Sequence, residues 1–553
     1  MRPSWSFQGM LREKAGMSGT WNEEYRFGSA RWAEPHEVQR AGMFSSPGWP
    51  VGYLGGRLLR YASDAPMLTI GGAGTGKLRD VIGHVFCTLQ SGSVLVLDPR
   101  GEIAATFLPA LAHHSIEAFF WNPFGLHGLP CHSCNPLDPI DPRAPTFHGD
   151  CTLAARALIT VSSKAEGKYF EQRASGWVEA ILRRLAESQG SVSLKDLMGP
   201  VNLVESGARG WPEFLEGMWN SAFDDVRRTA GEMLAKQQDS PREFGSIMGE
   251  IYAGLAVLDD PALQRSLEAP EFSMARLCQP GRPVVIFLMA PAEYLRQMAP
   301  VLRLLLTAAR LHKGRTPGSG RVLMLIDEAA QLGQFPLLME LYTFGRGLGI
   351  QTWTFWQGVG QFFENFGPTG AQTFFGSSGM QQIIGVRDYQ TAKLISDQLG
   401  TETLEFDDTR AQQVAGHQRL QAMQRFVGGG DPLEAAIEMM HYGRLETMRS
   451  KQARKMMTEE EVLSLAGDEQ ILFLPGLNLH PLRAARAPYF SRPEYAGLYL
   501  PNPYHPPQTH VQIATRWGTK SARVIREPVP GKYASFAQYR EGSWAYVEGY
   551  KPT

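Results

Sequence analysis

The 553-residue sequence contains no uninterrupted apolar run long enough to cross a membrane. Its longest apolar stretches, Val284–Ala290 and Val301–Ala309, fall far short of the roughly 20 residues that a spanning helix needs. The second stretch also contains Arg303. We therefore expect no membrane-spanning segment in this chain and a place in the cytoplasm.

The sequence also lacks an excess of either charge. It has 54 Lys and Arg against 55 Asp and Glu, a formal net charge of -1. This balance excludes a protein that holds nucleic acid simply by being basic throughout. Any contact with DNA must therefore be local.

Cysteine is scarce, with five residues and no regular spacing, which excludes a disulfide scaffold and fits a reducing compartment. Cys131 and Cys134 have the spacing of half a zinc site, but no second pair follows at finger spacing. This favours an ordinary loop, with a structural zinc ion as the alternative.

The pattern of apolar runs predicts an α/β fold that is interrupted by helices. A chain of this length needs more than one ordinary core. Short apolar runs rich in β-branched residues alternate with stretches of helical period, which is typical of a parallel sheet covered by helices. Strands are expected at Met67–Ile70, Ser93–Leu97, Val284–Leu288, Val322–Ile326, Thr352–Trp356, Gln382–Val386 and Gln470–Leu474.

Strand patterns fade between about residues 151 and 275, where amphipathic helices such as Phe170–Leu185 replace them. The expected order is a lead-in (1–56), a nucleotide-binding domain (57–150), an all-α domain (151–275), the second part of the nucleotide-binding domain (276–403), a mobile insertion (404–455), the last strand region (456–495) and a tail (496–553).

A glycine-rich segment between the first expected strand and helix has the context of a phosphate-binding loop. Its glycines would let backbone N–H groups surround phosphate oxygens, and the helix start would add its positive dipole end. Lys77 would reach the β- and γ-phosphates of ATP. The segment consists of Gly71, Gly72, Ala73, Gly74, Thr75, Gly76, Lys77 and Leu78.

Leu78 departs from this pattern, because the usual Ser or Thr hydroxyl there is a ligand of Mg²⁺. Magnesium would then depend on phosphate oxygens, water and acidic residues elsewhere. A glycine-rich turn that binds no nucleotide is the alternative interpretation of the segment.

The acidic half of an ATPase site is expected at Asp327 and Glu328, which follow the apolar run Val322–Ile326. An Asp in this place holds Mg²⁺ through water, and the next Glu polarises the attacking water. Acidic residues are common at the ends of strands. Their combination with the lysine loop in the same expected sheet makes an ATPase site the favoured interpretation.

Two later residues are further candidates. Gln357 ends the strand Thr352–Trp356 and would sense the γ-phosphate or orient water, and Arg346 would act as an arginine finger on a neighbouring subunit. A capped strand end and a solvated arginine are the alternatives. Trp353 and Trp356 fit packing in a core better than stacking on bases.

The order and spacing of several motifs resemble the type IV coupling proteins of the TraG/TraD type. The likeness covers most of residues 28–490. The motifs are Gly28–Ala33, Asp98–Glu102, Asn135–Asp138, Asp327–Gly333, Gly345–Gly347 with Gln357, Thr391–Lys393 before Leu399–Gly400, and Met457–Val462 before Asp468–Gln470.

This resemblance implies a RecA-like P-loop domain with an inserted all-α domain, ATP hydrolysis with Mg²⁺ and a homo-hexamer. It also implies transfer of single-stranded DNA and its relaxase, or of an effector protein, toward a type IV secretion channel with its ATPases and inner-membrane proteins. Family members often carry a non-hydroxyl residue where Leu78 stands.

Family members usually begin with membrane helices, which this sequence lacks. A membrane protein would then recruit the chain to the inner membrane, or the chain serves a cytosolic step. Two other functions stay open: a recruitment platform that binds nucleotide and hydrolyses it slowly, and another hexameric DNA translocase.

Overall fold

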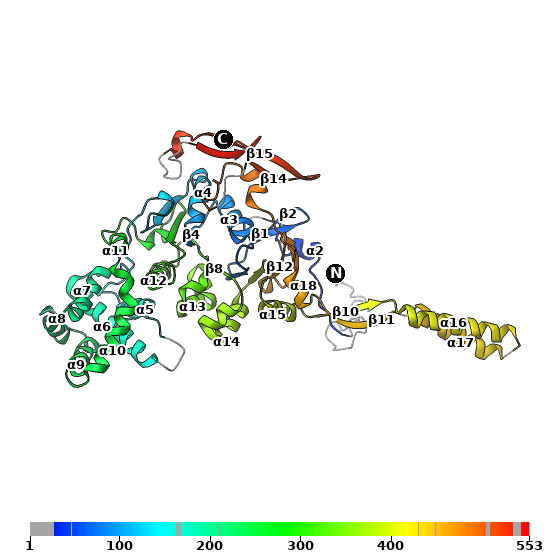
Figure 1. Cartoon of the computed structure of the whole chain (residues 1–553), viewed down its shortest axis with the longest axis horizontal. Helices are drawn as coiled ribbons and strands as arrows, with labels where there is room; N and C mark the ends of the chain where they lie inside the picture. Colours follow the sequence, from blue (N-terminus) through cyan, green and yellow to red (C-terminus); the bar gives the residue numbers. More distant parts are fainter. Residues whose placement is uncertain are drawn as a thin grey trace, which may run out of the picture. The chain divides into compact units, whose positions relative to one another are not determined.

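The computed structural model describes residues 27–551, apart from 46, 162–166, 208, 430, 448, 505–508 and 535–542 (Figure 1). Residues 1–26 and residue 46 of the lead-in expected at residues 1–56 therefore lie outside the described part. The chain forms two compact units: Ala33–Asp388 with Leu465–Thr553, and Met1–Trp32 with Tyr389–Ser464.

The larger unit is built on a sheet whose central strands are parallel and buried on both faces. Most of their side chains are buried and several of the strands are apolar runs, as expected where helices cover both sides of a parallel sheet. In spatial order these strands are β9 (Met380–Ile383), β3 (Met67–Ile70), β8 (Ile350–Trp356), β7 (Val322–Ile326), β4 (Ser93–Pro99), β6 (Val284–Ala290) and β5 (Glu117–Trp121).

Four antiparallel strands extend the sheet beyond β9, which gives 11 strands in the described residues. They are β12 (Glu469–Phe473), β13 (Leu482–Ala485), β1 (Trp49–Leu54) and β2 (Arg57–Tyr61). The predicted α/β class is confirmed. Strand β1 lies in the expected lead-in, where its Gly and Pro residues masked the alternation of buried Val51 and Tyr53, and β2 follows it with buried Leu59 and Tyr61.

Helices cover the two faces of the sheet, and most of them connect successive parallel strands. A π-helical turn, η2 (Leu78–Ile82), leads into α3 (Gly83–Thr88), which connects β3 to β4. The other helices next to the sheet are α2 (Pro35–Arg40), α4 (Glu102–His113), α12 (Ala299–Arg315), α13 (Pro336–Phe344) and α14 (Gly360–Ser377).

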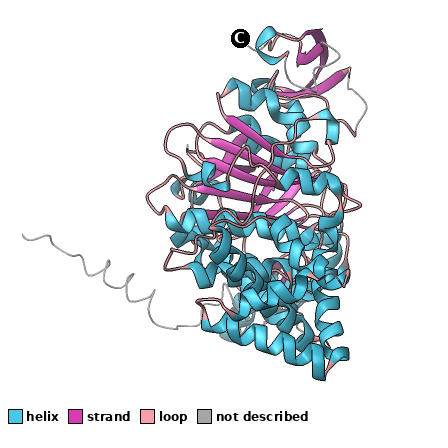
Figure 2. Cartoon of the chain, turned by 90° about the vertical axis from the view of Figure 1, so that its left-hand side faces the viewer, coloured by secondary structure: helices cyan, strands magenta, loops and turns pink. Residues whose placement is uncertain are grey.

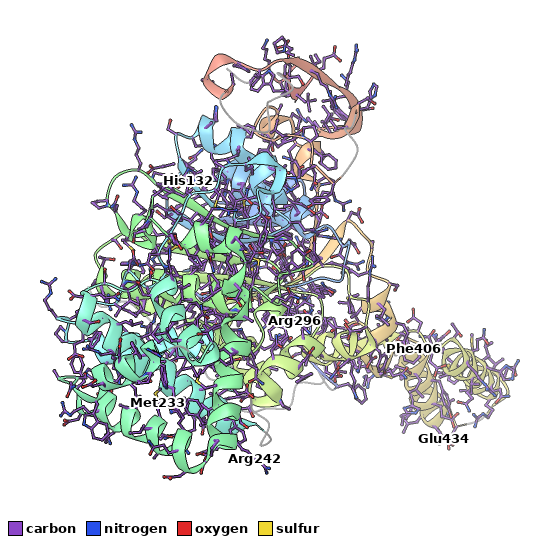
Figure 3. The ribbon with its side chains drawn as sticks, turned by 60° about the vertical axis from the view of Figure 1, so that its left-hand side comes forward. His132, Met233, Arg242, Arg296, Phe406 and Glu434 are labelled. Atoms are coloured by element: carbon purple, nitrogen blue, oxygen red, sulfur yellow. The ribbon has the colours of Figure 1, made fainter. Side chains whose placement is uncertain are left out.

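A group of helices is inserted between β5 and β6 and lies against one side of the sheet (Figure 2). Met233 and Arg242 mark it in Figure 3. Buried Arg303 of α12 joins this group to the sheet, since its guanidinium donates to the carbonyls of Ala157, Leu158 and Leu332. The inserted helices are α5 (Phe147–Leu158), α6 (Lys168–Gln189), α7 (Leu194–Glu205), α8 (Gly210–Trp219), α9 (Asp224–Asp239), α10 (Pro241–Leu255) and α11 (Pro261–Leu267).

The smaller unit contains a helical hairpin on a two-stranded ribbon. The ribbon pairs β10 (Thr401–Phe406) with β11 (Ser450–Lys455), and α16 (Thr409–Val427) and α17 (Pro432–Thr447) lie between them in sequence. Residues 27–30 pair with β10. Helices α15 (Tyr389–Leu399) and α18 (Glu459–Leu463) complete the unit. The segment expected as a mobile insertion is thus a ribbon and a hairpin, with Glu434 on α17 (Figure 3).

The segment expected as a tail, 496–553, contains a second sheet. Strands β14 (His510–Thr515), β15 (Gly518–Pro528) and β16 (Ser543–Val547) form an antiparallel meander. Alternate apolar residues, Val511, Ile513, Ala522 and Val547, are buried together on this sheet. The alternation escaped notice because the surrounding Pro, Tyr and His residues suggested an irregular segment.

No helix in the described residues is long and apolar enough to cross a membrane.

Candidate nucleotide site

The glycine-rich loop joins β3 to η2 at the carboxyl edge of the parallel strands. Its first residues are tied to neighbouring strand ends, since Gly71 N–H donates to the Trp356 carbonyl at 2.8 Å and Gly72 N–H to the Gly385 carbonyl at 3.1 Å. A Cβ on Gly71 would lie 2.5 Å from Ile384 Cγ1. The close approach explains the glycine at the start of the loop.

The middle of the loop takes backbone angles that favour glycine. Gly74 and Gly76 have φ of 71° and 90°. Thr75 braces the turn by donating from its hydroxyl to the Gly72 carbonyl at 2.8 Å. The loop thus curls tightly ahead of the helix start, which is the shape that places N–H groups around phosphate oxygens.

Lys77, Asp327, Glu328 and Gln357 come together beside this loop. Lys77 Nζ lies 2.9 Å from Glu328 Oε1 and 3.9 Å from Asp327 Oδ1. Gln357 donates from Nε2 to Glu328 Oε2 at 2.9 Å. Three separate strand ends, those of β3, β7 and β8, supply these four side chains, as the parallel register requires.

Glu328 adopts the left-handed conformation, with φ of 53° and ψ of 45°. This is unfavourable for a residue with a Cβ, and such strain is often found at functional sites. Its N–H donates to Asp327 Oδ1 at 3.1 Å. The turn lets adjacent carboxylates both approach Lys77, instead of pointing to opposite sides of the sheet as successive strand residues do.

Asp327 in the cluster and the buried Asp98 beside it hold their protons more tightly than free aspartate. Burial raises the pKa of Asp327 to about 6, and Lys77 opposes the shift. Burial raises the pKa of Asp98 to about 8, although its carboxylate accepts from the N–H groups of Ala104 and Ile103. Asp98 lies in the Asp98–Glu102 motif but was not among the candidate site residues.

Arg486 supports the loop from beneath and was missed in the sequence. Its NH1 donates to the Thr75 carbonyl at 2.7 Å and to Asp80 Oδ2 at 3.1 Å. The side chains of Arg486 and Asp80 are 3% and 1% exposed. A single arginine after an apolar strand gives no signal for a partner 406 positions away.

Arg346 does not join the cluster in its own chain. It lies in the short turn η7 (Gly345–Leu348) before β8, at the edge of the sheet opposite the carboxyl ends. Its Nε is 2.7 Å from Asp64 Oδ1, and 67% of its side chain is exposed. Asp64 precedes β3, so this ion pair joins the amino-terminal ends of two strands.

The two tryptophans and the cysteine pair considered in the sequence lie outside the nucleotide cluster. Trp353 and Trp356 are buried and donate to the hydroxyls of Thr69 and Thr354, so neither presents a face to a base. Cys131 is exposed and Cys134 is buried. No group of three His, Cys, Asp or Glu residues in the described ranges is arranged to hold a metal ion.

The residues fit a nucleoside triphosphate with magnesium. The loop is compact enough to exclude any side chain at Gly71, and one lysine follows it at the helix start. Asp327 and Glu328 present carboxylate oxygens, which are the ligands Mg²⁺ prefers. Leu78 instead packs against the hydrophobic core and supplies no oxygen.

A doubly covered parallel sheet with this loop and an acidic strand end defines a P-loop nucleoside triphosphatase fold of the RecA-like class. Residues 29–426 and 442–513 match the family "Type IV secretory system Conjugative DNA transfer". The chain belongs to this family.

Relatives in sequence include the conjugal transfer protein TraG of Escherichia coli, 24% identical over 420 residues, and the coupling protein VirD4 of Bartonella henselae, 28% identical over 224. The matches cover 69% and 40% of this chain. They span only 65% and 31% of the relatives' own lengths.

Solved structures of the plasmid coupling protein TrwB share the fold. The TrwB complex with ADP and Mg²⁺ aligns with a TM-score of 0.59 at 16% identity, covering 83% of this chain and 93% of TrwB. The complex with a non-hydrolysable ATP analogue aligns with a TM-score of 0.58. These alignments confirm the RecA-like domain with its all-α insertion.

Proposed function

We propose that this chain is an ATP-hydrolysing coupling motor of type IV secretion, which recruits single-stranded DNA with its relaxase, or an effector protein, and passes it to the channel. The observation that carries the proposal is the cluster of Lys77, Glu328, Asp327 and Gln357 beside the glycine loop. Membership of the conjugative DNA-transfer family supports the transferred substrate.

The ion pair of Lys77 with Glu328 suggests how the site changes when ATP binds. Lys77 Nζ would leave Glu328 for the β- and γ-phosphates, which carry more negative charge than one carboxylate. Glu328 would then be available to accept a proton from the attacking water. Gln357, already within hydrogen-bond distance of Glu328, would orient that water.

Asp327 is the residue we assign to Mg²⁺, through a bound water. The ion would neutralise charge on the phosphate oxygens. Asp327 must lose its proton for this role, and its raised pKa of about 6 still leaves it mostly ionised at neutral pH. The TrwB complex with ADP and Mg²⁺ supports this pairing of nucleotide and metal.

The test is ATP turnover by the purified chain, with and without single-stranded DNA. We expect turnover that DNA accelerates. Lys77→Ala should lose turnover, because the phosphate-directed cation of the loop is removed and charge neutralisation is a main resource of phosphoryl transfer. Lys195→Ala, at a lysine that is 70% exposed on the all-α insertion, is the matched control. Unchanged turnover in Lys77→Ala would refute the assignment.

A nucleotide-binding platform with weak hydrolysis is the second candidate, and Leu78 favours it. A leucine that packs on the core cannot supply the hydroxyl that usually orients Mg²⁺. A platform would bind ATP, and ATP would not change its affinity for DNA. Its ATP turnover would be slow, and DNA would not accelerate it. The assay above separates the two candidates.

The proposed motor acts as a homo-hexamer with inner-membrane proteins and channel ATPases as partners. Arg346 lies away from its own chain's cluster and is largely exposed, so we assign it to the nucleotide of an adjoining subunit. Another hexameric DNA translocase would use the same residues and differ in partners. Co-purification with a relaxase distinguishes the coupling protein from such a translocase.

A further inference from the structure

The turn between β14 and β15 exposes a tryptophan almost completely. Trp517 is 90% exposed, more than any other large apolar side chain in the described residues. The turn is well defined, since Trp517 N–H donates to Thr515 Oγ1 and the Thr515 hydroxyl donates to the Gly518 carbonyl at 2.8 Å. The protein therefore holds an indole ring outward, with most of its surface open to solvent.

Arg516 lies beside this ring and is the first of several cations. Its Cζ is 5.6 Å from the centre of the Trp517 ring, within the range of a cation–π contact. Lys520, Arg523 and Arg526 follow at exposed positions along β15. Lys520 and Arg526 are about 20 Å apart at the rise of an extended strand. Side chains alternate along a strand, so Lys520 and Arg526 lie on one face of β15 and Arg523 lies on the other. The cations thus form a row along the strand that starts at the tryptophan and occupies both of its faces.

These four cations lie in a stretch without acidic residues. Among the described residues, no carboxylate forms an ion pair with Arg516, Lys520, Arg523 or Arg526, and residues 509–526 contain no Asp or Glu. A local row of uncompensated positive charge in a chain of net charge -1 indicates an anionic partner.

The sheet beneath the row is anchored to the larger unit. Val511, Ile513, Ala522 and Val547 are buried together with Ala496. Trp544 and Tyr546 of β16 form a second buried cluster with Leu500, against which Ala112 of α4 packs. Strands β14 and β15 lie near α4 in Figure 1. The row is therefore carried on a packed scaffold.

We propose that this basic row, Arg516, Lys520, Arg523 and Arg526 with Trp517, is a contact site for single-stranded nucleic acid. Phosphates would pair with the cations and an unstacked base would lie on the indole, the combination typical of single-strand binding. In the proposed function, on which this assignment of the ligand rests, the strand is the transferred DNA.

A membrane surface is a weaker explanation of the same residues. Trp517 is the only large apolar side chain in the turn Thr515–Gly518, so little apolar area could enter a bilayer. The cations instead extend well along β15, away from the turn. An extended polyanion can follow the cations along the strand, whereas a bilayer would contact only the turn.

The experiment measures binding of a fluorescein-labelled oligothymidylate of about 20 nucleotides to the whole chain by anisotropy, without ATP. We expect Trp517→Ala to weaken binding about tenfold and Trp517→Phe to weaken it much less, because phenylalanine keeps a stacking face. Trp219→Ala is the matched control, since Trp219 is 54% exposed on α8 and outside the row.

Salt dependence gives an independent measurement. Replacing Lys520 and Arg523 by alanine should lower the slope of log affinity against log salt by about 0.7 for each phosphate that the variant no longer neutralises. Arg143→Ala, at an arginine with 90% side-chain exposure, should leave the slope unchanged. A general loss of folding would not change this slope in proportion to the number of cations removed.

Equal affinities for wild type, Trp517→Ala and Trp219→Ala, or an unchanged salt slope, would overturn the proposal. It would also be overturned if these variants lost binding to anionic phospholipid vesicles while keeping the oligonucleotide. Basal ATP turnover separates this inference from the proposed function. A Trp517→Ala chain that hydrolyses ATP normally and binds the strand normally contradicts only the inference, whereas an inactive wild type contradicts the motor.

Discussion

Lys77 and Glu328 form an ion pair of 2.9 Å although 251 positions separate them in the chain. The pair joins the phosphate loop to the acidic end of β7, across the strand β8 that lies between β3 and β7. In the proposed cycle this pair opens when phosphate takes the place of the carboxylate. Lys77 is then free to contact the phosphates, and Glu328 is free to accept a proton from water.

Replacing Glu328 by glutamine should leave ATP bound and unhydrolysed. The amide keeps the shape and the contact with Gln357 but cannot accept a proton from water. We expect turnover to fall at least about 100-fold with little change in nucleotide affinity. Turnover is measured by phosphate release and affinity with a fluorescent ATP analogue. Turnover at the wild-type rate would move the role of base to another residue.

Leu78→Ser should maintain or raise turnover. A hydroxyl at the start of η2 adds a ligand for Mg²⁺ and removes only a partly buried side chain from the core. Turnover is measured over a range of Mg²⁺ concentrations, with half-saturation expected at a lower concentration in the variant. Leu78→Ala is the control, because it removes the same packing without adding oxygen. A large loss in both variants would show that packing of Leu78 shapes the loop.

Arg346→Ala should bind ATP normally and hydrolyse it poorly. An arginine supplied across an interface is worth roughly 1,000-fold or more in rate. Mixing Arg346→Ala with Lys77→Ala chains should partly restore turnover, because each supplies what the other lacks. Arg321→Ala removes the other arginine that pairs with Asp64 and is the control for that ion pair. Mixtures that stay inactive at every ratio would exclude the trans role.

Asp327→Asn should stabilise the folded chain at neutral pH while it abolishes turnover. The folded pKa of about 6 lies above the ordinary value of 3.8, so the folded chain keeps a proton that the unfolded chain releases. Ionisation therefore costs stability as the pH rises from about 4 to 6, and the cost is complete above that range. The side chain is 18% exposed, which moderates the cost to on the order of 1–2 kcal/mol.

Melting temperatures at pH 5 and pH 8 check this expectation. The advantage of Asp327→Asn over wild type should be larger at pH 8. Asp239→Asn, at the exposed end of α9, is a suitable control for loss of one negative charge. An advantage that is equal at the two pH values would show that the carboxyl titrates normally.

The sequence predicted β3, β4, β6 and β7 well because these strands are nearly continuous apolar runs. It missed β5, which begins at Glu117, and placed the start of β9 at Gln382 instead of Met380. Met67–Ile70 and Val322–Ile326 coincide with β3 and β7 residue for residue. At the antiparallel edge, β12 was expected as Gln470–Leu474, whereas the short strands β13, β1 and β2 were not expected. Those segments become strands because they pair with neighbouring strands, as β1 does with β13, which is distant in the sequence, and their own hydrophobic pattern does not indicate it.

The candidate site likewise contains residues that the sequence predicted and residues that it did not. Lys77, Asp327, Glu328 and Gln357 were predicted because each follows an apolar strand, and parallel strand ends meet at one edge. Asp80 and Arg486 were missed because neither ends a parallel strand. Arg346 was recognised as a candidate, but its place at the opposite edge follows only from the register of β3 and β8.

The contact of Arg486 with Thr75 and Asp80 has a consequence for synthesis of the chain. A ribosome that adds about 5–20 residues per second makes the loop long before it makes Arg486. The interval is on the order of 20–80 seconds, given the 406 positions between Asp80 and Arg486. During that time Asp80 has only the half-exposed guanidinium of Arg79 as its cationic partner. The nucleotide site is therefore completed late in translation, and a nascent chain released early would carry the loop without the buried guanidinium that holds the Thr75 carbonyl.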